Sequence, residues 1–135
     1  MKTAKPFFDT NVLLYLLSED NGKADRVEKI MASGGTISVQ VLNEFASVGI
    51  RKLKMSYAEI RNALQIIRAI VSVEAITLDI HEQGLKIAER FGFSLYDSLI
   101  VSAALQSGCQ ILYSEDLQHG QKIQSQLVIQ NPFLD

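Results

Sequence analysis

The feature that most constrains the fold is the alternation of short apolar segments with longer stretches of helical periodicity. Strands are predicted at residues 6–8, 36–39, 110–113 and 127–129, with 75–78 as a strand or a connector. Helices are predicted at residues 12–17, 22–33, 40–54, 56–71, 79–91 and 94–107. Strands separated by whole helices require crossover connections, so the sheet should be mainly parallel and covered on both faces. The sequence therefore predicts an α/β fold.

Cap sequences support two of the predicted helix starts. Ser56 with Glu59, and Asp79 with Glu82, have the spacing of a capping box, in which two side chains satisfy exposed backbone N–H groups. A glycine follows each of the last two predicted helices, where glycine readily ends a helix. We therefore expect helices to begin close to residues 56 and 79.

The chain has the size and composition of one domain, which we expect to span residues 1–135. Its 135 residues are 47% hydrophobic and 21% charged, enough for a sizeable core, and no linker interrupts them. No apolar run approaches the roughly 20 residues of a membrane span, and no signal peptide is evident. A cytoplasmic location without membrane contact is expected, and the single Cys109 fits a reducing compartment. The net charge of −2 restricts nucleic-acid contact to a local surface.

Four acidic residues stand where carboxylates bind ligands or are costly to place. Asp9 follows the first predicted strand and Asp116 closely follows the strand at 110–113, so both lie at carboxyl ends of parallel strands. Glu44 and Asp97 share their predicted helix faces with apolar residues, so their carboxylates should face the core. Buried carboxylates stay ionised only with a cation, strong hydrogen bonds or a shifted pKa. One shared metal ion would account for all four.

The chemistry of these residues favours magnesium. Mg²⁺ takes oxygen ligands and retains several waters, whereas zinc prefers His and Cys sets that this pattern does not offer. Bound Mg²⁺ can acidify a water that attacks a phosphodiester, and a second ion about 3.5–4 Å away could stabilise the leaving oxygen. Asn11 and Ser114 are candidates for hydrogen bonds to the ligands or to metal-bound water, and Glu115 could share or replace the metal role of Asp116.

Each acid also has a purely structural interpretation, which stays open at this point. Asp9 could initiate the helix after it, and Ser94 with Asp97 has the spacing of another capping box. Glu44 could pair with a basic side chain on an exposed helix face, and Asp116 could be a plain loop residue. The sequence alone does not decide among these roles.

Four segments resemble, in order, the successive motifs of PIN domains. They are F-F-D-T-N-V-L (7–13), V-L-N-E-F (41–45), L-Y-D-S-L-I (95–100) and L-Y-S-E-D-L-Q-H-G (112–120). The length and the tail at 128–133 also resemble VapC-type toxins, the ribonuclease halves of bacterial toxin–antitoxin pairs. The resemblance implies a three-layer α/β/α sandwich, a catalytic Mg²⁺ or Mn²⁺ site on the four acids, an RNA substrate, frequent homodimers and inhibition by a small antitoxin.

Surfaces for RNA and protein partners are less defined. Three basic groups could line an RNA groove or be solvated surface, namely Lys23, Arg26 and Lys29, then Arg51, Lys52 and Lys54, then Lys86 and Arg90. The helix at 56–71 is apolar over much of its circumference, which favours either a dimer contact or burial within the domain. An antitoxin could dock in a groove by a helix or an extended segment and reach the site with a basic side chain. His81 and His119 are expected at the surface, since metal-activated water needs no general base.

Three rival functions remain at this stage. A haloacid-dehalogenase-like phosphatase also places an aspartate after its first strand, but it carries a second aspartate two residues on, where this chain has Asn11. A phosphorelay receiver domain expects paired acids after its first strand and a lysine after its last, and neither is evident. A PIN-like module that binds RNA or protein without cutting is distinguished only by metal-dependent turnover.

Overall fold

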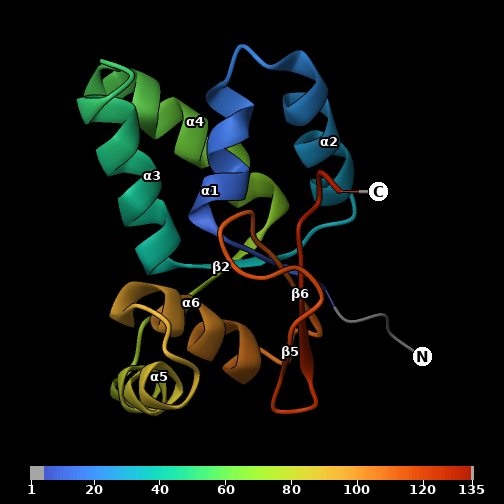
Figure 1. Cartoon of the computed structure of the whole chain (residues 1–135). Coiled ribbons are helices and arrows are strands. Elements are labelled where there is room, and N and C mark those ends of the chain that lie inside the picture. The colour runs from blue at the N-terminus through green and yellow to red at the C-terminus, as the bar shows by residue number, and fades with distance from the viewer. Residues whose placement is uncertain (1–4, 135) are drawn as a thin grey trace.

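A single six-stranded sheet runs through the centre of the structure, a computed structural model that describes residues 5–134 (Figure 1). The strand order is β3-β2-β1-β4-β6-β5, and all neighbouring pairs are parallel except β5 and β6. The strands are β1 (Phe7–Phe8), β2 (Thr36–Ser38), β3 (Ser72–Glu74), β4 (Ile111–Tyr113), β5 (Lys122–Ile123) and β6 (Leu127–Gln130). The predicted α/β fold with a mainly parallel sheet is confirmed.

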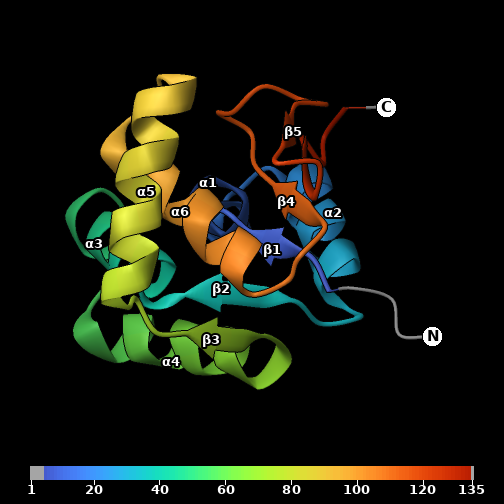
Figure 2. The same cartoon turned by 90° about the horizontal axis from the view of Figure 1, so that it is seen from below.

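Helices pack on both sides of this sheet. They are α1 (Thr10–Leu13), the 3-10 helix η1 (Leu14–Leu17), α2 (Asn21–Met31), α3 (Val39–Arg51), α4 (Tyr57–Ile70), α5 (Leu78–Phe91) and α6 (Leu95–Gln106). Figures 1 and 2 show α1, α2, α3 and α4 on one side of the sheet and α5 with α6 on the other, which gives three layers. Among the described helices, none is long and apolar enough to cross a membrane.

The central strands form the core and determine where the site lies. Phe7 and Phe8 of β1 are fully buried, and Phe7 pairs with Thr36 of β2 on one side and Leu112 of β4 on the other. In a parallel sheet, the residue that follows a central strand emerges at the carboxyl edge, where ligands commonly bind. That residue is Asp9.

Two strand predictions were wrong or incomplete. Residues 75–77 are the predicted connector and not a strand, because pairing with β2 places the third strand at 72–74, and the apolar Ile76 and Leu78 are exposed. The antiparallel β5 was not predicted, since its two residues are too few to show an alternating pattern.

Of the two predicted capping boxes, one is confirmed and the other is wrong. The capping box of Ser56 and Glu59 is present at the start of α4. At α5 the cap is Thr77, whose Oγ1 accepts the Ile80 N–H at 3.1 Å, so the predicted box at Asp79 is wrong. A Thr hydroxyl two residues earlier thus outcompetes the carboxylate that the sequence pattern favoured.

Candidate metal centre

Asp9 is held at the carboxyl edge of β1 by its own backbone and by its helix. Its N–H donates to the carbonyl of Tyr113 in β4 at 2.9 Å, which continues the parallel pairing for one residue. Its Oδ1 accepts the Thr10 N–H at 2.7 Å, so Asp9 is also the N-cap of α1. The helix therefore begins at Thr10, two residues before the predicted start, and the residue Asp9 is only 5% exposed.

The second carboxylate oxygen of Asp9 contacts both predicted supporting residues. Ser114 donates its Oγ hydrogen to Oδ2 at 2.8 Å, and Asn11 donates from Nδ2 to the same oxygen at 3.4 Å. Both partners are donors, and hydrogen bonds to the charged form of a carboxylate favour ionisation. Asn11 and Ser114 thus hold Asp9 in one orientation from two different segments.

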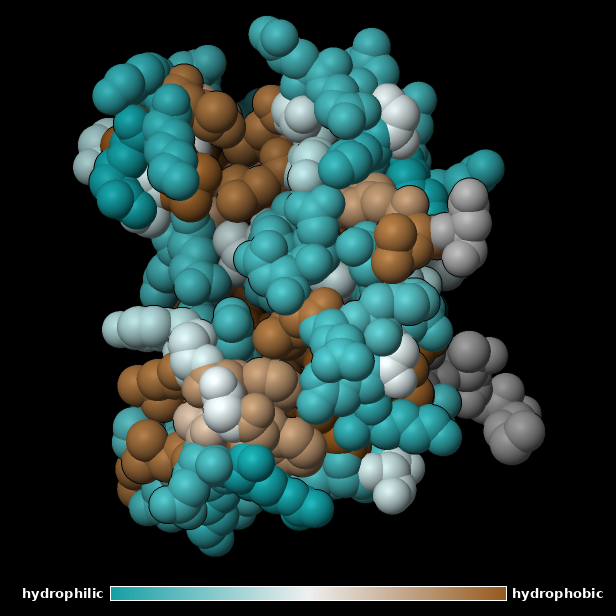
Figure 3. Space-filling model, in the orientation of Figure 1, coloured by the Kyte–Doolittle hydropathy of each residue, from teal (hydrophilic) through white to brown (hydrophobic). Residues whose placement is uncertain are grey.

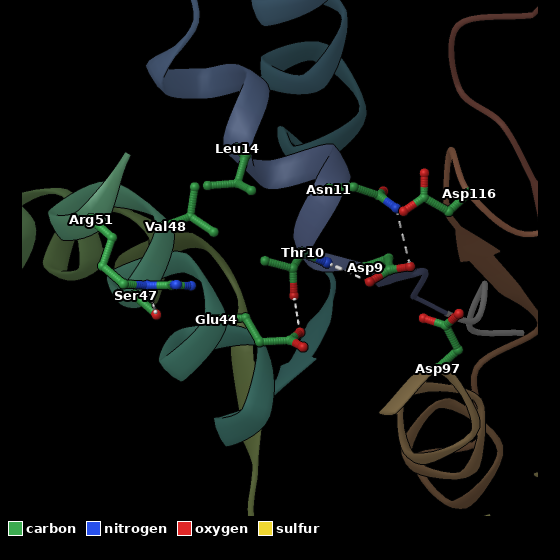
Figure 4. A pocket seen from close by; sticks show the side chains of 10 residues that line it. All are labelled: Asp9, Thr10, Asn11, Leu14, Glu44, Ser47, Val48, Arg51, Asp97 and Asp116. Atoms are coloured by element: carbon green, nitrogen blue, oxygen red, sulfur yellow. Dashed lines mark hydrogen bonds between the residues drawn. The ribbon is translucent and has the colours of Figure 1, made fainter. Parts of the chain in front are cut away.

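Glu44 reaches the same region from α3. Thr10 donates its Oγ1 hydrogen to Oε1 of Glu44 at 2.6 Å, which ties the start of α1 to α3 (Figure 4). This role of Thr10 was not predicted, and the only signal for it was its place in the polar triplet after β1. A short bond to a charged acceptor is among the stronger hydrogen bonds in proteins, so the carboxylate of Glu44 has a restricted position.

Asp97 combines a cap contact with a free carboxylate. Ser94 is the N-cap of α6 and its Oγ accepts the N–H of Asp97 at 3.1 Å. This is half of the capping box that the sequence allowed, because it uses the backbone of Asp97 and not its side chain. The Asp97 carboxylate lies instead on the wall of a pocket (Figure 4).

One pocket collects all four predicted acids. A cavity of about 310 Å³ is lined by Asp9, Glu44, Asp97 and Asp116 together with Thr10, Asn11, Leu14, Ser47, Val48 and Arg51. The acids come from four separate segments, and Figure 4 shows their side chains around a common space. Their convergence is a property of the fold, while their role as metal ligands stays a prediction.

The burial predicted for Glu44 and Asp97 needs a correction. Asp9 is buried, but Glu44 and Asp97 are only half-buried and Asp116 is exposed. The reason is that Glu44 and Asp97 line an open pocket at this edge of the sheet instead of packing within the apolar core. A helical pattern locates the face of a residue but not the depth at which the core ends.

Burial, and to a smaller extent the neighbouring acids, change the acidity of Asp9. The pKa of Asp9 is raised from its ordinary 3.8 to about 6, chiefly because burial removes water from the charged carboxylate. The negative charges of Asp97 and Glu44 raise this pKa further, while the hydrogen bonds from Ser114 and the Thr10 N–H lower it. A cation in the pocket would favour the ionised form by opposing both burial and repulsion.

The donor set fits a hard divalent ion that keeps much of its water. Within residues 5–134, no group of three or more His, Cys, Asp or Glu side chains is arranged so that it could hold a metal ion as it stands. Mg²⁺ in proteins, however, is commonly bound through one or two carboxylates and several waters. The four carboxylates in the lining and the raised pKa of Asp9 agree with that mode of binding.

Glu115 and the two histidines lie apart from the pocket. The Glu115 carboxylate accepts from Tyr15 Oη at 2.7 Å and from Lys23 Nζ at 3.2 Å, and Asp116 lines the pocket in its place. His119 accepts the Asn131 N–H through Nδ1 at 3.0 Å, and His81 is exposed on α5. The geometry therefore favours Asp116 over Glu115 as the acid of this loop.

Comparison with known protein families gives one match that covers most of the chain. Residues 7–122 match the family model of the PIN domain. No curated protein matches the chain significantly in sequence.

Several solved structures share the fold. VapC20 from Mycobacterium tuberculosis, described as a Sarcin-Ricin loop cleaving toxin, is 21% identical with a TM-score of 0.68, covering 83% of this chain and 90% of its own. A toxin–antitoxin complex from Klebsiella pneumoniae is 20% identical with a TM-score of 0.73, covering 96% and 98%. VapBC2 from Rickettsia felis, bound to a DNA fragment from its promoter, is 18% identical with a TM-score of 0.67, covering 93% and 96%. At such identities the likeness shows a common fold.

Proposed function

Because this chain belongs to the PIN-domain family, we propose that it is a divalent-metal-dependent endoribonuclease and the toxin of a toxin–antitoxin pair. The observation that carries the proposal is the convergence of four carboxylates on one pocket, where the pKa of Asp9 is raised by burial and by its acidic neighbours. The description of VapC20 as a Sarcin-Ricin loop cleaving toxin supports RNA as the substrate class. The toxin–antitoxin complexes among the similar structures support an antitoxin partner. These roles would place the protein in the cytoplasm.

The acids would bind the metal and the polar residues would hold the acids. Mg²⁺ or Mn²⁺ would be held, directly or through water, by Asp9, Glu44, Asp97 and Asp116. The bound ion supplies an acidified water and neutralises charge at the scissile phosphate. Thr10 fixes Glu44, while Ser114 and Asn11 fix Asp9, so the two carboxylates are oriented before substrate binds. Attack by water would break the bond from phosphorus to the 3′-oxygen, leaving a 5′-phosphate and a 3′-hydroxyl.

The experiment that tests this proposal is cleavage of a mixed RNA pool by partner-free protein. Cuts should require Mg²⁺ or Mn²⁺, disappear with EDTA, and carry 5′-phosphate ends. The variant Asp97→Asn, purified identically, controls for contaminating nuclease and should not cut. If RNA is bound but never cut under any metal condition, the protein is a non-catalytic binding module; if both proteins cut equally, the activity does not belong to this pocket.

Arg51 is the basic residue best placed to contact the RNA backbone. It lines the acidic pocket, and its Nε donates to Ser47 Oγ at 3.0 Å, which leaves the terminal guanidinium N–H groups for a phosphate (Figure 4). Lys52 and Lys54 follow it at the end of α3 and are exposed. A phosphate that approaches four carboxylates needs positive charge of this kind.

Replacing Arg51 by Ala is expected to weaken RNA binding and its dependence on salt. Measured with Asp97→Asn protein to prevent cleavage, the slope of log affinity against log salt should fall by about 1, the amount for one lost phosphate contact. Arg68→Ala removes an exposed arginine of α4 that does not line the pocket, and its slope should stay unchanged. Equal losses for the two variants would mean that only net charge matters.

A second groove is the place we propose for the antitoxin. It has a volume of about 580 Å³, is lined by Leu14, Leu17, Val48 and Leu53 among others, and shares Asn11, Leu14 and Val48 with the acidic pocket. Figure 3 shows a hollow with hydrophobic side chains between α3 and the α1–η1 segment. A segment lying there would reach the acids with a basic side chain. A homodimer is also proposed, since Ile66 and Ile70 of α4 are exposed.

A further inference from the structure

A cluster of four side chains lies beside the metal pocket and outside its lining. Lys23 of α2 is at its centre, with its Nζ 4.7 Å from the ring centroid of Tyr15 and 4.9 Å from that of Phe133. The two rings meet edge to face at 4.8 Å. Glu115 completes the cluster by pairing with Lys23 at 3.2 Å. We call Tyr15, Lys23, Glu115 and Phe133 the Lys23 clasp.

The hydrogen bonds of the clasp form a closed triangle. Tyr15 donates its Oη hydrogen to Glu115 Oε1 at 2.7 Å, and Lys23 donates to Glu115 Oε2 and to Tyr15 Oη, both at 3.2 Å. Both carboxylate oxygens of Glu115 are thereby occupied and turned from the pocket. Lys23 is 36% and Glu115 28% exposed, and ion pairs so open to water add little to stability. The clasp is thus better explained by the position it imposes on Glu115 than by stabilisation of the fold.

The backbone of Glu115 connects the clasp to Asp9. Its N–H donates to Oδ1 of Asn11 at 3.2 Å. With Oδ1 used as an acceptor, the Asn11 amide must present Nδ2 to its other partner, which is Oδ2 of Asp9. The orientation of the Asn11 amide is thus determined from the loop that also carries Ser114 and Asp116.

The C-terminal segment braces the clasp from the outside. Arg26 donates from Nε to the Pro132 carbonyl at 2.9 Å, and the Phe133 N–H donates to Asn131 Oδ1 at 2.9 Å. Figure 1 shows the C-terminal end beside α2. These contacts place the Phe133 ring against Lys23, which limits the directions in which the ammonium can turn.

We propose that Tyr15, Lys23 and Glu115 are positioning residues for the metal pocket, because their contacts hold the loop after β4 so that Asn11 faces Asp9 and Asp116 faces the pocket. The inference rests on the proposed function, since it concerns the same pocket. None of the three side chains lines that pocket, so they act through Asn11 and the loop backbone.

The test is Mn²⁺ binding by the full chain, measured by calorimetry without RNA, beside cleavage kinetics and a melting curve for each variant. Tyr15→Phe keeps the ring and removes the hydroxyl, so it should weaken Mn²⁺ binding about 10- to 100-fold, as loss of an outer-sphere partner does. Its kcat should fall with little change in KM. Tyr57→Phe makes the same change at an exposed tyrosine of α4 and should alter neither property.

Glu115 provides the second pair of variants. Glu115→Ala should weaken Mn²⁺ binding like Tyr15→Phe, whereas Glu115→Gln keeps an oxygen acceptor for Tyr15 and should recover most of the affinity. If Asp9→Asn loses Mn²⁺ but Tyr15→Phe and Glu115→Ala bind it as wild type does, the clasp proposal is overturned and the proposed function stands. If Asp9→Asn also binds Mn²⁺ normally, the metal pocket is wrong and both proposals fail. The clasp proposal would likewise be overturned if Mn²⁺ binding weakens only in variants whose melting curves show partial unfolding.

Discussion

Substituting Asp9 by asparagine is expected to slow RNA cleavage by about 10²- to 10⁴-fold at saturating Mg²⁺. A bound metal contributes several kcal/mol of charge stabilisation in the transition state, and each 1.36 kcal/mol is a factor of ten in rate. Asparagine preserves the shape of Asp9 and can still accept the Thr10 N–H, but it carries no charge. The loss should therefore appear in the rate constant of the cleavage step, measured under single-turnover conditions, while the fold is retained.

The control for this substitution is Asp25→Asn on α2. Asp25 is exposed and does not line the acidic pocket, so the same chemical change there should leave the rate within about twofold of wild type. Raising Mg²⁺ further should not restore the rate of Asp9→Asn, because the site is already saturated and more ions cannot replace the missing carboxylate charge. Full activity in Asp9→Asn would remove Asp9 from the mechanism and leave the other three acids as the metal site.

Much of this pocket could be predicted from local sequence because the relevant signals are short. A strand that ends at Phe8 places Asp9 at the sheet edge, and helical spacing turns Glu44 and Asp97 toward the side that carries the pocket. Asp116 follows β4, which neighbours β1 in the sheet, so its proximity to Asp9 follows from the parallel topology. The placement of each acid needed only one element and the crossover rule, whereas the adjacency of β4 and β1 is a finding of the structure.

The contacts that support these acids could not be predicted in the same way. Thr10 meets Glu44 across 34 residues of sequence, and Tyr15 meets Glu115 across 100. The hydrophobic periodicity of the sequence does not indicate such pairs, since they depend on how η1, α2 and the C-terminal segment pack together. The partial exposure of Glu44 and Asp97 was missed for the same reason, because one side of a helix is exposed to solvent wherever no neighbouring element covers it.

Stability of the metal-free protein is expected to decrease as the pH rises from about 4 to 6.5, owing to Asp9. Its pKa is about 6 in the folded chain against 3.8 ordinarily, so in this window the folded state binds more protons than the unfolded state. Stability then falls with rising pH, by about 3 kcal/mol in total at 1.36 kcal/mol for each unit of pKa difference. The penalty is complete above the folded pKa and absent below the unfolded one.

The difference between wild type and Asp9→Asn isolates this effect from the other titrating groups. In EDTA, urea unfolding at a series of pH values should show the variant gaining up to about 3 kcal/mol relative to wild type between pH 4 and pH 7. Any hydrogen bond lost with the carboxylate shifts this difference by a constant amount and leaves its pH dependence unchanged. Parallel stability curves for the two proteins would show that burial does not penalise the Asp9 charge.

Metal should reverse the penalty in wild type alone. A ligand that binds only the folded state adds about 2.7 kcal/mol at a concentration 100 times its Kd, so Mg²⁺ at pH 7 should bring the wild-type protein close to the variant. Asp9→Asn should gain much less at the same concentration. The Asp9 carboxylate would thus destabilise the metal-free protein and stabilise the metal-bound protein. This pattern is expected of a charge that serves metal binding and not folding.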